Sequence, residues 1–178
     1  EAVAKHNQRN PNDAMVYLNY GAVDPMLTND RCNFWHFRFD ADSDMKMEAL
    51  TNMMASDAAI KKVYLINQDY SFGHAVSKAS ISMLNKKRPD IEIVGDDLHP
   101  LAKIKDFSPY IAKIRASGAD SVITGNWGAD LALLVKAASE ARLDVNFYTQ
   151  YAGIVGGLSA MGDAAADRVK QVTMWHVN

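Results

Sequence analysis

Three aromatic side chains with polar tips stand just beyond three predicted strands, where a small molecule could be bound. Tyr70, Trp127 and Tyr151 each belong to the loop that follows a short apolar run. Open parallel sheets bind ligands beyond the carboxyl ends of their strands, so the three rings are expected at one edge. Rings that combine an apolar face with a hydrogen-bonding tip suit a small organic ligand. The alternative is that each ring simply covers the core beneath it.

Signatures of catalysis and of metal binding are missing from the sequence. The stretch Gly157–Met161 lacks the second glycine of a nucleophile elbow, and no phosphate-binding glycine loop with its Lys-Ser/Thr pair occurs. Asp96 and Asp97 follow a predicted strand and are expected to be solvated. We therefore predict a protein that is not an enzyme and has no catalytic residues, metal or cofactor. Five histidines, never four residues apart, are expected at the surface or at an interface: His6, His36, His74, His99 and His176.

The composition excludes further classes of protein. The chain has 178 residues, 48% of them hydrophobic, which suffices for one core, or for one core and part of another. A formal net charge of -2 gives no basic footprint for nucleic acid. No apolar run reaches about 18 residues, so no direct membrane insertion is expected. The N-terminal residues lack the apolar region of a signal peptide, as a trimmed exported protein also would.

An alternation of short apolar runs and helical patterns predicts an α/β fold. The predicted strands span residues 62–66, 91–95, 121–125, 146–149 and 169–176. The predicted helices span residues 43–56, 71–87, 108–118, 128–142 and 158–163. Met47, Leu50 and Met54 share one side of the first helix, and Ser71 and Ser108 are expected to cap the next two. Apolar strands separated by helices predict a parallel sheet covered on both faces.

The first forty residues follow a different pattern. Residues 14–18 and 34–39 predict two strands, and a short helical stretch precedes them. These elements are too few to bury their own apolar faces, so we expect them to end a domain that begins outside this sequence. The single cysteine, Cys32, is either a buried small hydrophobe or half of a disulfide with a cysteine outside the chain.

Three stretches of sequence carry a family resemblance: HFRF at residues 36–39, KVYLINQDYSFG at 62–73 and SGADSVITGNWG at 117–128. Together they resemble the branched-chain amino acid type (type I periplasmic) substrate-binding proteins of ABC transporters, in order and along essentially the whole chain. The resemblance implies two Rossmann-like lobes, each a doubly wound parallel sheet, which are joined by three hinge strands and trap ligand between them.

On that scheme the chain is a fragment of a two-lobe protein. Residues 1–40 are the C-terminal remnant of lobe one and the first hinge crossing, 41–172 are lobe two, and 173–178 start the return crossing. Members of the family often carry a disulfide in lobe one, which implies that the partner of Cys32 lies outside this chain.

The resemblance also assigns ligand-binding positions. Gly21 and Val23 match the loop with which lobe one contacts a ligand carboxylate, although the hydroxyl-bearing residues usual there are not evident. Tyr70 matches a tyrosine that closes over the ligand, and Trp127 an aromatic residue that lines the cleft. Tyr151 stands where amino-acid binders have a carboxylate for the ligand ammonium. Because a phenol cannot neutralise a buried cation, a ligand without an amino group is expected.

These observations lead to one expected function and one rival. The expected function is that of the periplasmic solute-binding component of an ABC importer. It would bind a small carboxylate-bearing solute, an amino acid or an aromatic acid, by hinge closure and deliver it to the permease subunits. If the ligand carries an amine, Asp130 on the neighbouring helix is the acid expected to substitute. The rival is a ligand-sensing regulatory or receptor module on the same fold.

The chain by itself is predicted to bind its ligand weakly, because the resemblance gives it only one side of the cleft. Half of the contacts and the free energy of lobe closure would be absent. Isothermal titration calorimetry with candidate carboxylates is expected to show no binding tighter than about 1 mM, or about -4 kcal/mol. Micromolar binding by the 178-residue chain would contradict this half-site interpretation.

Overall fold

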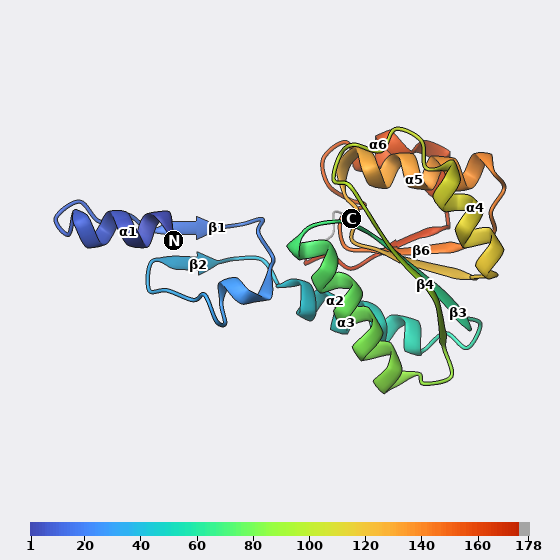
Figure 1. Ribbon diagram of the computed structural model, residues 1–178, viewed down its shortest axis with the longest axis horizontal. Coiled ribbons are helices and arrows are strands. Elements are labelled where there is room, and N and C mark those ends of the chain that lie inside the picture. The colour runs from blue at the N-terminus through green and yellow to red at the C-terminus, as the bar shows by residue number, and fades with distance from the viewer. Residues whose placement is uncertain (175–178) are drawn as a thin grey trace.

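A five-stranded parallel sheet forms the centre of the protein (Figure 1). The computed structural model describes residues 1–174, and within them the sheet has the strand order β4-β3-β5-β6-β7. Every neighbouring pair in it is parallel, so the predicted sheet is confirmed. The strands are β3 (Lys62–Gln68), β4 (Glu92–His99), β5 (Ser121–Thr124), β6 (Asn146–Thr149) and β7 (Val169–Gln171).

Helices cover both faces of this sheet, and each face buries its own apolar core (Figure 1). On one face lie α2 (Ser43–Ala55) and α3 (Ser71–Lys87). On the other lie α4 (Ser108–Ser117), α5 (Gly128–Glu140), the short α6 (Gly157–Met161) and the turn η2 (Gly162–Ala165). Met47, Leu50 and Met54 of α2 are fully buried, as their predicted periodicity requires.

The starts of two helices differ by one residue from the predicted caps. α3 begins at Ser71 and α4 at Ser108, so Tyr70 and Phe107 take the N-cap positions, and neither side chain caps its helix. The predicted serine caps are therefore wrong. Phe107 is buried in one core and Tyr70 packs against the other. A ring that packs against the core, and not a serine hydroxyl, therefore stands at the start of each helix.

Strand β4 is longer than predicted because it pairs with β3 as far as His99. Asp97 consequently lies inside the strand, where it accepts a hydrogen bond from the Tyr64 hydroxyl (2.7 Å) and pairs with Lys113 (3.0 Å). The expected solvation of Asp97 is therefore wrong, whereas Asp96 is exposed. His99, expected at the surface, is fully buried at the end of the strand.

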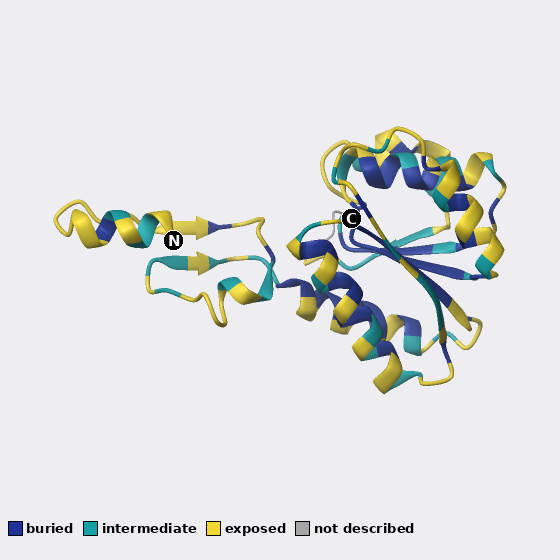
Figure 2. Ribbon diagram, in the orientation of Figure 1, coloured by how far each residue is buried: buried dark blue, intermediate teal, exposed yellow. Residues whose placement is uncertain are grey.

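Residues 1–40 extend away from the lobe as a separate arm (Figure 1). The arm contains α1 (Ala2–Arg9), β1 (Tyr17–Asn19), η1 (Pro25–Leu27) and β2 (His36–Arg38), and β1 pairs in parallel with β2. Both strands are shorter than predicted. Much of the arm is exposed (Figure 2), including the rings of Tyr20 at 88% and Phe34 at 79%. The arm does not bury its own apolar faces, as its composition led us to expect.

Other predictions have mixed outcomes. Cys32 is exposed, so its interpretation as a buried side chain is wrong. The last strand ends at Gln171 rather than His176, which lies outside the described residues. The domain boundaries after residues 40 and 172 stay predictions. Within residues 1–174, no helix is both long and apolar enough to cross a membrane.

Adjacent methionines of α2 provide a matched test of the core, since Met54 is fully buried and Met53 is 38% exposed. Met54→Ala is expected to lower the free energy of unfolding by about 2–5 kcal/mol, because truncation leaves a cavity. Met53→Ala is expected to change it by less than about 0.5 kcal/mol. Urea denaturation followed by circular dichroism would measure both variants. Equal effects would contradict the packing of α2 described above.

Candidate functional site

The strand order reverses at β3, and this reversal opens the edge of the sheet where the candidate residues lie. From β3 the chain crosses through α3 to β4 on one side, and then through α4 to β5 on the other side. α3 and α5 therefore leave β3 and β5 on opposite faces of the sheet (Figure 1). Tyr70 lies in the loop between β3 and α3, and Trp127 lies in the loop between β5 and α5. A switch point of this kind is where open parallel sheets bind ligands.

Gly73 allows α3 to begin tightly against the end of β3. A Cβ atom at this position would lie 1.8 Å from the carbonyl oxygen of Gln68, which is too close for any larger residue. The same carbonyl accepts a hydrogen bond from the backbone N–H of Tyr70 at 2.9 Å. This compact turn fixes the direction in which the Tyr70 side chain leaves the sheet.

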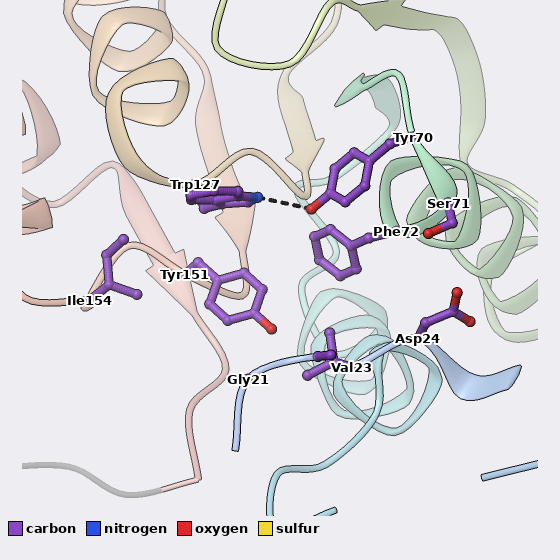
Figure 3. Close-up of a pocket in the computed structure, with 10 residues that line it drawn as sticks. Gly21, Val23, Asp24, Tyr70, Ser71, Phe72, Trp127, Tyr151 and Ile154 are labelled. Carbon is purple, nitrogen blue, oxygen red and sulfur yellow. Dashed lines mark hydrogen bonds between the residues drawn. The ribbon is translucent and has the colours of Figure 1, made fainter. Parts of the chain in front are cut away.

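A cavity of about 360 Å³, called here the aromatic cavity, lies at the switch point (Figure 3). The rings of Tyr70, Trp127 and Tyr151 come from three different loops and share this one concave surface, as expected. Gly21 and Val23 reach it from the arm. The structure thus brings all five predicted site residues together, and their role in binding stays a prediction. The lining residues that sequence reasoning missed are Ala22, Asp24, Ser71, Phe72 and Ile154.

Contacts between rings hold the aromatic cavity open. The indole Nε1–H of Trp127 donates a hydrogen bond to the Tyr70 hydroxyl at 2.9 Å (Figure 3). The Phe72 ring meets the Tyr151 ring edge-on, with centroids 5.6 Å apart. Phe72 is buried in the first turn of α3, and its position in the run Tyr-Ser-Phe was the only signal in the sequence. Because the Tyr70 hydroxyl accepts from Trp127, its own proton remains available to donate into the cavity.

The two phenols are neutral hydrogen-bond donors. Burial raises the pKa of Tyr70, and the hydrogen bond from Trp127 opposes that shift in part. Burial also raises the pKa of Tyr151, and the negative charge of Asp40 adds to the effect. Both side chains therefore keep their protons at neutral pH. A neutral donor in a largely apolar cavity can bind a carboxylate or a carbonyl oxygen without a positive charge.

Asp130 does not serve as the substitute acid that the sequence suggested. Its side chain is buried behind the loops, where one carboxylate oxygen accepts from Gln68 Nε2 (2.7 Å) and from the backbone N–H of Ala102 (2.9 Å). It does not line the aromatic cavity. Its hydrogen bonds instead hold the end of β3 against the loop after β4.

Asp40 is the carboxylate that sequence reasoning missed. Lys46 Nζ pairs with Asp40 Oδ2 at 2.6 Å and lies 4.8 Å from the centre of the Tyr151 ring. Arg38 and Asp42 form a second buried ion pair at 3.0 Å beside it. Charges spaced this way at a helix start are usually solvated, so the burial of these four side chains leaves no signal in the sequence.

The described residues offer little for other chemistry. Within residues 1–174, no group of three His, Cys, Asp or Glu side chains could hold a metal ion. The Gly157–Met161 stretch forms the short helix α6, and Ser159 on it is exposed.

Comparison with known proteins gives consistent matches. A family model described as periplasmic binding protein matches residues 1–178. The Leu/Ile/Val-binding protein homolog 4 of Brucella abortus is 39% identical over 170 residues, which cover 95% of this chain and 40% of that protein.

Solved structures give the same picture. The leucine-, isoleucine-, valine-, threonine- and alanine-binding protein of Brucella ovis, in a closed conformation, matches with 40% identity and a TM-score of 0.81, over 92% of this chain and 42% of that one. An ABC transporter solute-binding protein of R. palustris in complex with 4-hydroxybenzoate matches with 23% identity and a TM-score of 0.70. The match covers 81% of this chain and 39% of that one. The chain thus spans about 40% of the length of the relatives it matches.

The raised tyrosine pKa values predict how stability depends on pH. A phenol whose pKa is raised by folding stabilises the folded state while it is protonated, and this stabilisation is lost above the ordinary tyrosine pKa of about 10. The free energy of unfolding is therefore expected to fall between about pH 10 and pH 12. Tyr151→Phe should make that fall less steep, as urea denaturation at several pH values would measure. An unchanged slope in this variant would contradict the burial of the phenol.

Proposed function

Since the chain belongs to the periplasmic binding protein family, we propose that it forms one side of the cleft in the solute-binding component of an ABC importer. The ligand is a small carboxylate-bearing organic solute, an amino acid or an aromatic acid. The protein acts in the periplasm and presents its loaded form to the permease subunits. It binds the solute without changing it chemically, because the family consists of solute-binding proteins.

One observation carries the proposal: two neutral phenol donors face a cavity whose other walls are mainly rings and aliphatic side chains. The hydroxyls of Tyr70 and Tyr151 are complementary to carboxylate oxygens, which only accept hydrogen bonds. The surrounding rings are complementary to the hydrocarbon body of the solute. One similar structure is that of a protein that binds amino acids and another is a complex with 4-hydroxybenzoate, and both ligand classes have this combination of groups.

We propose that binding occurs by closure, and two distant segments of the chain line the cavity that closure would complete. Gly21, Val23 and Asp24 belong to the arm, whereas the rings belong to the lobe. Val23 and the ion pairs of residues 38–46 hold the arm against the lobe at the cavity. The closure proposed here therefore brings the remaining part of the longer protein over the ligand, and the ligand shifts an equilibrium between open and closed conformations. A ligand can shift that equilibrium only by its difference in affinity for the two conformations. The permease then distinguishes closed protein from open protein.

A thermal-shift screen of the full-length gene product tests the proposal. Amino acids, benzoate-type acids and matched neutral amides would be compared. A carboxylate at a hundred times its dissociation constant is expected to add about 2.7 kcal/mol of stability. Tyr70→Phe is expected to weaken carboxylate binding about 3- to 10-fold through the loss of one hydrogen bond. Tyr110→Phe is the matched control, because Tyr110 on α4 does not line the cavity.

The outcomes separate the possible functions. Equal shifts with carboxylates and amides, or none with either, would contradict a carboxylate-binding cleft. Carboxylate binding without uptake, in membrane vesicles that contain the permease, would favour the sensing module over the importer. Turnover of any bound compound would contradict a purely binding role.

A further inference from the structure

Strands β3 and β5 part before they reach the edge of the sheet where the aromatic cavity lies. Among the described residues, their pairing ends at Leu65 opposite Ile123, although β3 remains paired with β4 to its end. Two residues further along each chain segment stand Asn67 and Gly125. Gly125 begins the loop between β5 and α5, residues 125–127, called here the tryptophan loop. The backbone ladder therefore does not hold this loop against β3.

The side chain of Asn67 makes the connection instead. Asn67 is fully buried, its Oδ1 accepts a hydrogen bond from the Gly125 N–H at 2.6 Å, and its Nδ2 donates one to Ser77 Oγ on α3 at 2.8 Å. Ser77 donates in turn to Asp96 Oδ1 of β4 at 2.8 Å. A Cβ atom on Gly125 would lie only 3.1 Å from Asn67 Oδ1, so glycine favours this close approach. Asn67 thus joins the start of the tryptophan loop to β3, α3 and β4.

Gln68, the next residue of β3, holds the other end of the tryptophan loop. Successive side chains of a strand point to opposite faces of the sheet, so Gln68 points toward α5 whereas Asn67 points toward α3. Gln68 Nε2 donates to Asp130 Oδ2 in the first turn of α5 at 2.7 Å, and both residues are buried. Two adjacent side chains of β3 therefore hold the loop on both sides of Trp127.

The loop carries Trp127 to the hydrogen bond that it donates to the Tyr70 hydroxyl at 2.9 Å (Figure 3). Trp127 is 41% exposed, so packing alone does little to fix its ring. Tyr70 lies only two residues after Gln68, so the residues that hold the loop and the ring that it meets belong to one short segment.

We propose that Asn67 and Gln68 are positioning residues of the aromatic cavity. They hold the tryptophan loop where Trp127 donates to Tyr70, and the Tyr70 proton is then directed to the solute. The inference rests on the proposed function, to which it adds the residues that arrange the donor. Neither is among the described residues that line the cavity, so both act through Trp127 and Tyr70. A donor arranged before the solute arrives reduces the ordering cost of binding.

The first test needs no ligand. In the full-length gene product with isotope-labelled tryptophan, the indole N–H signal of Trp127 is assigned by its loss in Trp127→Phe. Tyr70→Phe removes the acceptor, so the signal is expected to move upfield and to exchange faster with water. Gln68→Met and Asn67→Leu are each expected to move it in the same direction. Adding Tyr70→Phe to either variant should then change it little.

A binding test measures the consequence for the cleft. Calorimetry on the full-length gene product would use benzoate, 4-hydroxybenzoate and leucine as probes. In the wild-type background Tyr70→Phe is expected to weaken carboxylate binding about 3- to 10-fold. In the Asn67→Leu or Gln68→Met background the same change is expected to weaken it by less than about twofold, because the two sites are coupled.

Ser80→Ala is the matched control for general damage. Ser80 is fully buried on α3, and its hydroxyl donates to the Val76 carbonyl of the same helix at 2.7 Å. Its loss is expected to lower the melting temperature and to leave both the Trp127 signal and the Tyr70→Phe penalty unchanged.

The outcomes separate this inference from the proposed function. An unchanged Trp127 signal in both Asn67→Leu and Gln68→Met, or an undiminished Tyr70→Phe penalty in both, would overturn the positioning role and leave the proposed function intact. An effect in one variant alone assigns the role to that residue and removes it from the other. If Asn67→Leu does not fold, Gln68→Met decides. If no carboxylate binds the wild-type protein, the proposed function is overturned and the Trp127 signal alone decides the positioning role.

Discussion

The reversal of strand order at β3 is the constraint on which the candidate site depends. β3 lies between β4 and β5, and the chain reaches these neighbours by crossing in opposite directions. The helices that follow β3 and β5 therefore cover opposite faces of the sheet, so their loops diverge instead of packing together. The diverging loops carry Tyr70 and Trp127, which meet through one hydrogen bond across the gap. A sheet with sequential strand order would have no such opening.

Burial gives the cleft its chemistry. Tyr70 and Tyr151 keep their protons because the apolar surroundings disfavour the phenolate, so they act as donors without carrying charge. Asp40 and Lys46 neutralise each other beside Tyr151, and Asp24 is a charged residue of the cavity lining. Buried ion pairs are weak contributors to stability, and this one places a carboxylate next to the Tyr151 side chain.

The arm contributes Gly21 and Val23 to the cavity, although these residues are far in sequence from Tyr70, Trp127 and Tyr151. Val23 packs into the core beside α2, and the buried ion pairs Arg38–Asp42 and Asp40–Lys46 join the end of the arm to the start of α2. The arm is therefore anchored where it meets the cavity, while its distal apolar side chains are exposed. The relatives are longer proteins, of which the chain spans about 40%.

Local patterns in the sequence determined the parallel sheet, the order of its helices and the loops that carry Tyr70, Trp127 and Tyr151. Periodicity, apolar runs and turn residues act over a few positions, so they can be recognised without coordinates. Only the tertiary structure decided that His99 is buried, that Asp97 lies within a strand, that Asp130 faces away from the cavity and that Asp40 stands beside Tyr151. Those facts depend on which distant segments cover a side chain, and burial by distant segments leaves no local pattern.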